Sequence, residues 1–207
     1  MEIFDFKDGN GPVPAHRHKN PNGSVGGWIA ETANVVETAT VGYLAWVFGE
    51  AQVSGEAQVY GDARVYGEAQ VSDDAHVSDD ALVYGSARVS GNSKVSGKAK
   101  IFGDAQIFGD AWISGMAQVS DGAKVSGDTW VSDDARVFGD AQVYDSAKIC
   151  GNARVSGHAH VAGSAHVSDK AWIFGFAKVS GDTQISGDTE VSGPVLPVCS
   201  APSILGW

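Results

Sequence analysis

The sequence lacks several features that stabilise or anchor other proteins. Two cysteines in 207 residues, Cys150 and Cys199, are too few for a disulfide framework, which favours a reducing compartment. The longest apolar run, residues 41–48, is far too short to cross a bilayer, and no charged-then-apolar leader opens the chain. We therefore expect a soluble cytoplasmic protein that makes no membrane contact.

Basic residues are also scarce. The chain has 14 lysines and arginines against 25 aspartates and glutamates, which gives a formal net charge of −11 at pH 7. Because nucleic acids attract basic surfaces, this balance argues against a general nucleic-acid binder. The sequence also contains no phosphate-binding loop, nucleophile elbow or CxxC pair, so three common kinds of active site have no motif to support them.

What the sequence has instead is one short pattern that repeats without interruption from residue 29 to residue 191. Every sixth residue in this range is Val or Ile, and from residue 33 onward the residue two places before each of them is small. A period of six is neither a helix period nor simple alternation, so it indicates internal repetition. The small residue is Ala everywhere except at Ser93, Thr129, Thr183 and Thr189.

Each hexapeptide predicts one short strand and one corner, which together make one side of a prism. The Ala and the Val face inward, and the residue between them faces outward. The first corner residue from position 49 to position 193 is always Gly or Asp, both of which tolerate a left-handed backbone. Three hexapeptides, or 18 residues, return the chain to its starting side, and successive coils lie ~4.8 Å apart.

The charges follow the same repeat. Most acidic residues fall at the corners, and most basic residues fall on the outward strand positions. We therefore expect a prism with acidic edges and mildly basic faces. This arrangement provides solubility, and we expect the two kinds of charge to pair with each other along the stack.

The spacing resembles that of the hexapeptide-repeat superfamily, which contains many bacterial acyltransferases. The resemblance covers most of the chain and implies an all-β fold, a single left-handed parallel β-helix of about nine 18-residue coils. The chain departs from the family pattern just after the aliphatic residue, where it usually has Ser, Tyr or Phe instead of a small residue. The segment Gly26-Gly27-Trp28-Ile29-Ala30 is also similar to the start of some uncharacterised bacterial and phage members.

We expect one domain with three parts. Residues 1–27 break the repeat and carry turn signals, and we predict that they cap the open first coil, with the basic cluster at 16–19 either solvated or holding an anion. Residues 28–193 form the β-helix. Residues 194–207 contain three prolines, which cannot donate ladder hydrogen bonds, and we predict an extended apolar tail that covers the last coil or contacts a neighbouring subunit.

One side of the predicted prism is more apolar than the other two. Side A contains Ile29 and every eighteenth residue after it, side B is built in the same way from Val35, and side C from Val41. The residue after the aliphatic one is aromatic in six of ten coils on side A, but in only two on side B and one on side C. Exposed apolar surfaces of this kind mark interfaces. The resemblance implies a homotrimer packed side to side, and the predicted interface residues are Phe48, Tyr66, Tyr84 and Phe102.

Two serines interrupt the aromatic positions of side A. Ser120 lies between Phe102 and Phe138, and Ser156 lies between Phe138 and Phe174, so the flanking rings are ~9.6 Å apart. This space suits one flat ring, and neighbouring arginines suit an anionic group. We predict that a nucleotide-like ligand is held, without being transformed, in a cleft between subunits by Gln118, Arg136, Phe138, Arg154, His158, Trp172 and Phe174. The competing interpretation is that a neighbouring subunit's side chains fill these gaps.

Two other functional classes remain open. The resemblance implies that an acyltransferase would act through a histidine near such a cleft, which makes His158 or His160 the alternative catalytic residue and acetyl-CoA the cofactor. The repeat has no protruding loop and no helical arm, which enzymes of the superfamily often have, so we prefer a non-catalytic binding protein without a cofactor. The second alternative is a structural spine, such as an assembly or virion component.

Two sets of residues have the composition of a metal site. His158, His160 and His166 could bind zinc, but they point from a corner and two different sides. The aspartate pairs at 73–74, 79–80 and 133–134 could hold Ca²⁺, but they are also explained as solvated turns. We therefore predict no metal site.

Overall fold

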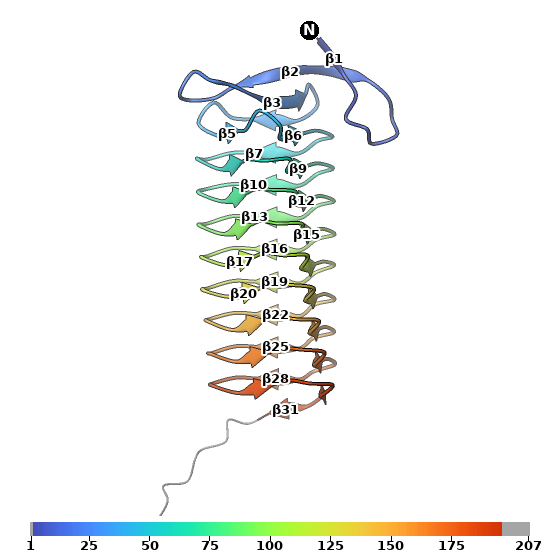
Figure 1. Ribbon diagram of the computed structural model, residues 1–207, viewed down its shortest axis with the longest axis vertical. Helices are drawn as coiled ribbons and strands as arrows, with labels where there is room; N and C mark the ends of the chain where they lie inside the picture. Colours follow the sequence, from blue (N-terminus) through green and yellow to red (C-terminus); the bar gives the residue numbers. More distant parts are fainter. Residues whose placement is uncertain (1, 196–207) are drawn as a thin grey trace, which may run out of the picture.

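The computed structural model describes residues 2–195, and in this range the protein is an all-β solenoid with no helix. Strands of two residues alternate with corners, and the chain winds around a three-sided prism in 18-residue coils (Figure 1). Between residues 28 and 191 each strand pairs in parallel register with the strand 18 residues further on, as Gln118 does with Arg136. The predicted fold class is confirmed, and the nine strands of the smallest sheet correspond to about nine turns. The left-handed winding stays a prediction from the resemblance.

Side A is a 12-stranded sheet that begins with three antiparallel strands and continues with parallel ones. The antiparallel strands are β1 (Glu2–Phe4), β2 (Val13–Lys19) and β3 (Val25–Ala30). The parallel strands are β6 (Trp46–Val47), β9 (Arg64–Val65), β12 (Leu82–Val83), β15 (Lys100–Ile101), β18 (Gln118–Val119), β21 (Arg136–Val137), β24 (Arg154–Val155), β27 (Trp172–Ile173) and β30 (Glu190–Val191).

Sides B and C are parallel sheets of ten and nine strands. Side B contains β4 (Asn34–Val35), β7 (Gln52–Val53), β10 (Gln70–Val71), β13 (Arg88–Val89), β16 (Gln106–Ile107), β19 (Lys124–Val125), β22 (Gln142–Val143), β25 (His160–Val161), β28 (Lys178–Val179) and β31 (Pro194–Val195). Side C contains β5 (Thr40–Val41), β8 (Gln58–Val59), β11 (His76–Val77), β14 (Lys94–Val95), β17 (Trp112–Ile113), β20 (Trp130–Val131), β23 (Lys148–Ile149), β26 (His166–Val167) and β29 (Gln184–Ile185).

The core is a thin column of stacked Ala, Val and Ile side chains. In each middle coil both inward residues are fully buried, as Ala81 and Val83 are. Ser93 replaces an inward Ala and is also fully buried, because its hydroxyl donates a hydrogen bond to the carbonyl of Ser90 at 2.8 Å. A polar residue is therefore tolerated in this core only where a corner carbonyl satisfies it.

The corners use the left-handed backbone that the Gly-or-Asp pattern predicted. Asp121, for example, has a φ of 57°, and its Oδ2 accepts a hydrogen bond from the backbone N–H of Gly139 in the next coil at 3.0 Å. This bond offsets the cost of placing a residue with a Cβ atom in this conformation. The six aspartates that share the arrangement are Asp73, Asp79, Asp121, Asp133, Asp145 and Asp169.

The N-terminal strands lie across the first coil at one end of the prism (Figure 1). Phe6 is buried against Phe48, while His18 bonds the carbonyl of Ala39 through Nε2 at 3.0 Å. Asn20 accepts the N–H of Val41 at 2.8 Å through Oδ1. These contacts give backbone groups of the first coil partners that a preceding coil provides elsewhere in the stack.

The basic cluster at 16–19 belongs to this covering segment. His16 Nδ1 lies 2.8 Å from Glu31 Oε1, and the Arg17 guanidinium donates to the carbonyls of Gly26 and Tyr43. The same guanidinium lies over the Tyr43 ring, 4.1 Å from its centroid. The cluster is therefore neither a simple solvated loop nor an open anion site, because three of its four side chains contact their own chain.

Both predicted boundaries of the repeat are crossed by strands. β3 (Val25–Ala30) pairs with β2 on one edge and with β6 on the other, so it belongs to the covering segment and to the first coil. At the other end, β31 (Pro194–Val195) extends the ladder by pairing with β28. Proline is tolerated there because the structure describes no further strand that would need its missing N–H. The predicted apolar tail beyond residue 195 lies outside the described residues.

Residues 2–195 also contain no helix that could span a membrane.

Candidate binding face

The aromatic residues of side A form a continuous stack in the first half of the prism. The rings of Phe48, Tyr66, Tyr84 and Phe102 follow one another at centroid distances of 4.8 to 5.1 Å, with interplanar angles of 5° or less. Phe6 of the covering segment continues the stack above Phe48 at 4.8 Å. The distance between successive coils therefore matches the distance at which flat aromatic rings stack, and each ring covers the faces of its neighbours.

Stacking determines how much of the predicted interface is accessible. Phe48 is only 6% exposed, because Phe6 covers one face of its ring and Tyr66 the other. Tyr66, Tyr84 and Phe102 are half-buried. Burial raises the pKa of both tyrosine hydroxyls above the ordinary value. Of the four predicted interface residues, these three present surface to a neighbour.

The stack is interrupted in the second half, and the chain itself covers the serine of one of the two gaps. The Trp172 indole lies against the Phe174 ring, with centroids 4.6 Å apart and planes tilted by 35°. Its Nε1–H donates to the Ser156 hydroxyl at 3.0 Å, and Ser156 is 5% exposed. The indole thus covers Ser156 and lies against one of the two rings that flank this gap.

Four of the predicted ligand-binding residues form a column on the outward face of side A. Gln118, Arg136, Arg154 and Trp172 are adjacent in register on β18, β21, β24 and β27. Both arginines are exposed, and neither forms an ion pair with any residue between 2 and 195. The structure therefore brings these four predicted ligand-binding residues together and leaves two cations available to an anion.

The C-terminal end of this column borders a hollow of about 520 Å³. Arg154 and Trp172 line it from the strands, while Asn152 and Lys170 line it from the corner between sides C and A. The hollow ends at Asp188 and Glu190, where Lys170 Nζ lies 3.8 Å from Asp188 Oδ1. It combines an indole, two cations and an amide within two coils.

His158 takes part in a different cluster from the one predicted. It lies on the corner between sides A and B, where its ring stacks on that of Phe176 with centroids 5.1 Å apart. Its Nδ1 is 3.6 Å from Asp140 Oδ2, one coil earlier on the same corner. His160 lies on the outward face of side B, edge-on to the Tyr144 ring at 6.3 Å. The two alternative catalytic histidines thus contact different neighbours.

The residues considered as metal ligands make other contacts in the structure. His166 lies on side C, and its Nε2 is 3.2 Å from the Cys150 sulfur. Burial raises the pKa of this thiol, and Asp133 and Asp169 raise it further, so the thiol stays protonated at neutral pH. The first aspartate of each pair considered for Ca²⁺ accepts a hydrogen bond from a glycine N–H of the next coil. No three His, Cys, Asp or Glu residues between 2 and 195 are grouped as a metal site.

The expected pairing between acidic edges and basic faces is rare. Among residues 2–195 only one lysine or arginine, Lys170, lies within ion-pair distance of a carboxylate. The lysines and arginines on the strands have no carboxylate next to them in their own columns, because the acidic residues stand mostly at the corners, and Lys170 is itself a corner residue next to Asp188. The basic faces therefore remain available to external anions.

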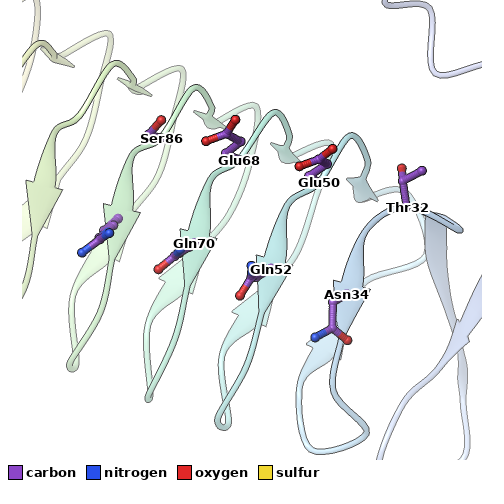
Figure 2. A pocket seen from close by; sticks show the side chains of 8 residues that line it. Thr32, Asn34, Glu50, Gln52, Glu68, Gln70 and Ser86 are labelled. Atoms are coloured by element: carbon purple, nitrogen blue, oxygen red, sulfur yellow. The ribbon is translucent and has the colours of Figure 1, made fainter.

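Side B carries an open polar groove at its N-terminal end that the sequence analysis missed. Figure 2 shows Glu50 and Glu68 at the corner, with Asn34, Gln52 and Gln70 projecting from β4, β7 and β10. The groove has a volume of about 640 Å³. The signal that reveals this groove in the sequence is the 18-residue spacing of its polar residues.

Side C carries a second missed feature. Trp112 and Trp130 are adjacent in register, and their rings stack at 5.0 Å with an angle of 4°. They are 42% and 41% exposed, more than the residues of the side A stack. Lys94 and Lys148 flank them in the same outward column. Their spacing of 18 residues would have revealed the pair.

Comparison with known families supports the repeat. Residues 57–73, 75–91 and 147–163 match the model of a family described as the YdcK beta solenoid repeat. No curated protein matches the chain. The match and the geometry agree, so the chain is a β-solenoid repeat protein.

Proposed function

We propose that this β-solenoid repeat protein is a non-catalytic binding protein that holds a small anionic, nucleotide-like ligand on side A. The observation that carries this proposal is the juxtaposition of Arg154 with Trp172 at the edge of a hollow, with Arg136 in register one coil earlier. An aromatic surface binds a flat ring, and a guanidinium without a carboxylate partner binds phosphate with paired hydrogen bonds.

Lys170 and Asn152 support the same assignment from the adjoining corner. The lysine places a second positive charge on the hollow, and the asparagine amide offers both a donor and an acceptor to a ring edge or a sugar hydroxyl. Asp188 and Glu190 close the C-terminal end of the hollow with negative charge. A phosphate would therefore bind toward Arg136, away from these carboxylates, with the ring beside Trp172.

We also propose that the ligand is held between subunits of a homotrimer. The half-buried rings of Tyr66, Tyr84 and Phe102 form an apolar strip on the same side as the hollow. If this strip packs against a neighbour in a closed ring, every subunit buries the same surface, and a cleft remains beside it. The hollow at Trp172 lies further along the same sheet, where the stack has ended.

Calorimetry with AMP, GMP, UMP and cyclic AMP tests the ligand. We expect at least one of them to bind more tightly than about 1 mM, which is only ~4 kcal/mol, and Arg154→Ala to weaken that binding at least about tenfold. Arg88→Ala is the matched control, because Arg88 has the same place in the repeat on side B. The absence of binding, or an unchanged affinity in Arg154→Ala, would contradict the proposed ligand.

Light scattering tests the assembly. We expect a trimeric mass for the wild type and a smaller mass for Tyr84→Asp combined with Phe102→Asp, because two carboxylates cannot be buried in an apolar contact. Phe48 is left unchanged, since its substitution would disturb the covering segment. A wild type that is monomeric at micromolar concentration would contradict the trimer.

The absence of catalysis can be tested separately. Purified protein should consume no acetyl-CoA when sugars, amines or amino acids are offered as acceptors. Turnover that disappears in His158→Ala or His160→Ala would replace the proposed function by an acyltransferase.

A further inference from the structure

The contact between Trp172 and Ser156 shows one way in which this repeat covers a serine. Two of the three tryptophans placed 16 residues after a serine reach back and donate their Nε1–H to the serine hydroxyl one coil earlier, whereas Trp130, placed in the same way after Ser114, stacks on Trp112. Trp172 does so to Ser156 at 3.0 Å, and Trp112 does so to Ser96 at 3.4 Å. A tryptophan 16 places after a serine can therefore cover the space beside that serine, whereas a residue without a ring leaves the space open.

Side B also contains a serine between two aromatic positions, but the residue 16 places after this serine has no aromatic ring. Ser126 lies between Phe108 and Tyr144, and the residue 16 places after it is Gln142. The structure has a hollow of about 340 Å³ here, and Phe108 is 40% exposed. Its lining includes Phe108, Lys124, Ser126, Gln142, Tyr144 and Asp145.

The hollow has the height of one flat ring. Phe108 and Tyr144 are two coils apart, or ~9.6 Å. The stacked rings of side A occupy the same repeat position one coil apart, at 4.8 to 5.1 Å. A ring midway between Phe108 and Tyr144 would therefore stack on both as Tyr66 stacks on Phe48 and Tyr84. No aromatic ring between residues 2 and 195 takes that position, since Tyr144 contacts only the edge of His160.

The polar groups at the hollow favour a negatively charged substituent on the ring. Lys124 is exposed and pairs with no carboxylate in the described part of the chain. The one acidic residue of the lining, Asp145, already accepts the N–H of Gly163 at 2.9 Å through Oδ2. Gln142 can donate to and accept from the polar edge of a heterocycle. The hollow thus offers one unpaired cation, one amide and two apolar faces.

We propose that this hollow, the Ser126 slot, binds a flat aromatic ring that carries a carboxylate or phosphate. The ring stacks between Phe108 and Tyr144, its anionic group bonds Lys124, and its polar edge contacts Gln142 or the Ser126 hydroxyl. The Trp172 indole beside Ser156 is an example of such a ring that the chain itself supplies. The slot lies on side B and does not depend on the proposed ligand of side A.

Indole-3-acetate is the probe that follows from this comparison, and calorimetry or ligand-observed NMR measures its binding. We expect a Kd below about 1 mM for the wild type, and weaker binding by at least about tenfold in both Ser126→Phe and Lys124→Gln. The phenylalanine fills the slot by continuing the aromatic column, while the glutamine removes the charge from an exposed position where folding is unaffected. Indole and acetate, tested singly, should each bind more weakly than the conjugate.

Two controls isolate the slot. Ser90→Phe adds a ring on the other face of Phe108 and should leave the affinity unchanged, since the slot stays open. Arg154→Ala should also leave it unchanged, which separates this site from the one on side A. The slot is disproved if indole-3-acetate does not bind at 1 mM, if Ser126→Phe and Lys124→Gln both bind normally, or if Ser126→Phe changes only the mass of the particle, which would mean that a second copy's side chain fills the hollow.

Discussion

The two halves of side A have the same backbone and different surfaces. From Phe48 to Phe102 every coil contributes a ring to one continuous stack, and Phe6 of the covering segment extends it. From Ser120 to Phe174 rings alternate with serines, and the column beside them carries Arg136 and Arg154. In the first half the aromatic side chains stack on one another. In the second half they leave ring surfaces and positive charges that a ligand can contact. Binding capacity in this repeat therefore arises where the outward pattern is broken.

The largest effect is expected from a charge in the core that both halves share. Ile107 and Val125 are adjacent in register and no more than 1% exposed. Ile107→Asp or Val125→Asp should destabilise the whole stack by several kcal/mol, because an unpaired charge would be buried. Thermal unfolding followed by circular dichroism measures this. Gln106→Asp on the outward face is the control, and a normal melting curve for the core variants would mean that these residues face no core.

The next largest effect should come from exchanging the patterns of the two halves. Tyr84→Ser opens a gap in the continuous stack and removes two ring contacts, at 5.0 and 5.1 Å. We expect a loss of about 2 kcal/mol in urea unfolding, since each aromatic pair contributes roughly 0.5–1.5 kcal/mol beyond its buried area. Ser120→Tyr makes the opposite change between Phe102 and Phe138. If Tyr84→Ser unfolds at the wild-type urea concentration, stacking does not stabilise the first half.

A smaller effect is expected at the corner between the halves. Asp121→Ala keeps a Cβ atom on a left-handed backbone and removes the hydrogen bond to Gly139, so we expect a loss of about 1–2 kcal/mol. Asp121→Gly loses the same bond but relieves the backbone, and should cost less. Chemical unfolding of the two variants measures the difference. Equal stability of the alanine and glycine variants would show that the backbone there is not strained.

The smallest effect concerns the titration of the stacked tyrosines. Burial raises the pKa of Tyr66, and the neighbouring Tyr84 raises it further, while Arg64 lowers it. Since the folded pKa lies above the unfolded value of about 10, the stability that these neutral hydroxyls contribute is present below pH 10 and is lost as the pH rises further. Phenolate absorbance should show later titration than in a tyrosine amide. Tyr84→Phe should bring the pKa of Tyr66 down, and an unchanged titration would contradict the coupling.

The fold followed from the sequence because the repeat is local and strict. An aliphatic residue every six positions, with Ala two places earlier, fixes which side chains face inward in every coil, as Val83 and Ala81 show. The Gly-or-Asp rule likewise predicted left-handed corners such as that at Asp121. The register followed as well, because three equal sides return the chain after 18 residues. The alignment of Gln118, Arg136, Arg154 and Trp172 on side A was therefore predictable.

The rest depended on side chains that leave their own coil. Phe6 joins the aromatic stack from a segment that has no repeat, and Trp172 reaches back into the gap at Ser156. His158 pairs with Asp140 and Phe176 along a corner instead of joining the ligand-binding column. None of these contacts follows from the period, because a side chain's direction depends on the size and charge of its neighbours above and below.

The sequence by itself determined the prism, its three sides and the residues in each column, since these properties depend only on backbone periodicity and on which residues face inward. Only the tertiary structure decided which of the aromatic gaps are open. Ser156 and Ser126 are indistinguishable by their place in the repeat, yet an indole closes the first, while Gln142 leaves the second as a hollow. The physical reason is that the direction of an indole depends on its neighbours in the stack: Trp172 turns toward Ser156, whereas Trp130, equally far after Ser114, stacks on Trp112. A glutamine amide such as that of Gln142 supplies no ring in either direction.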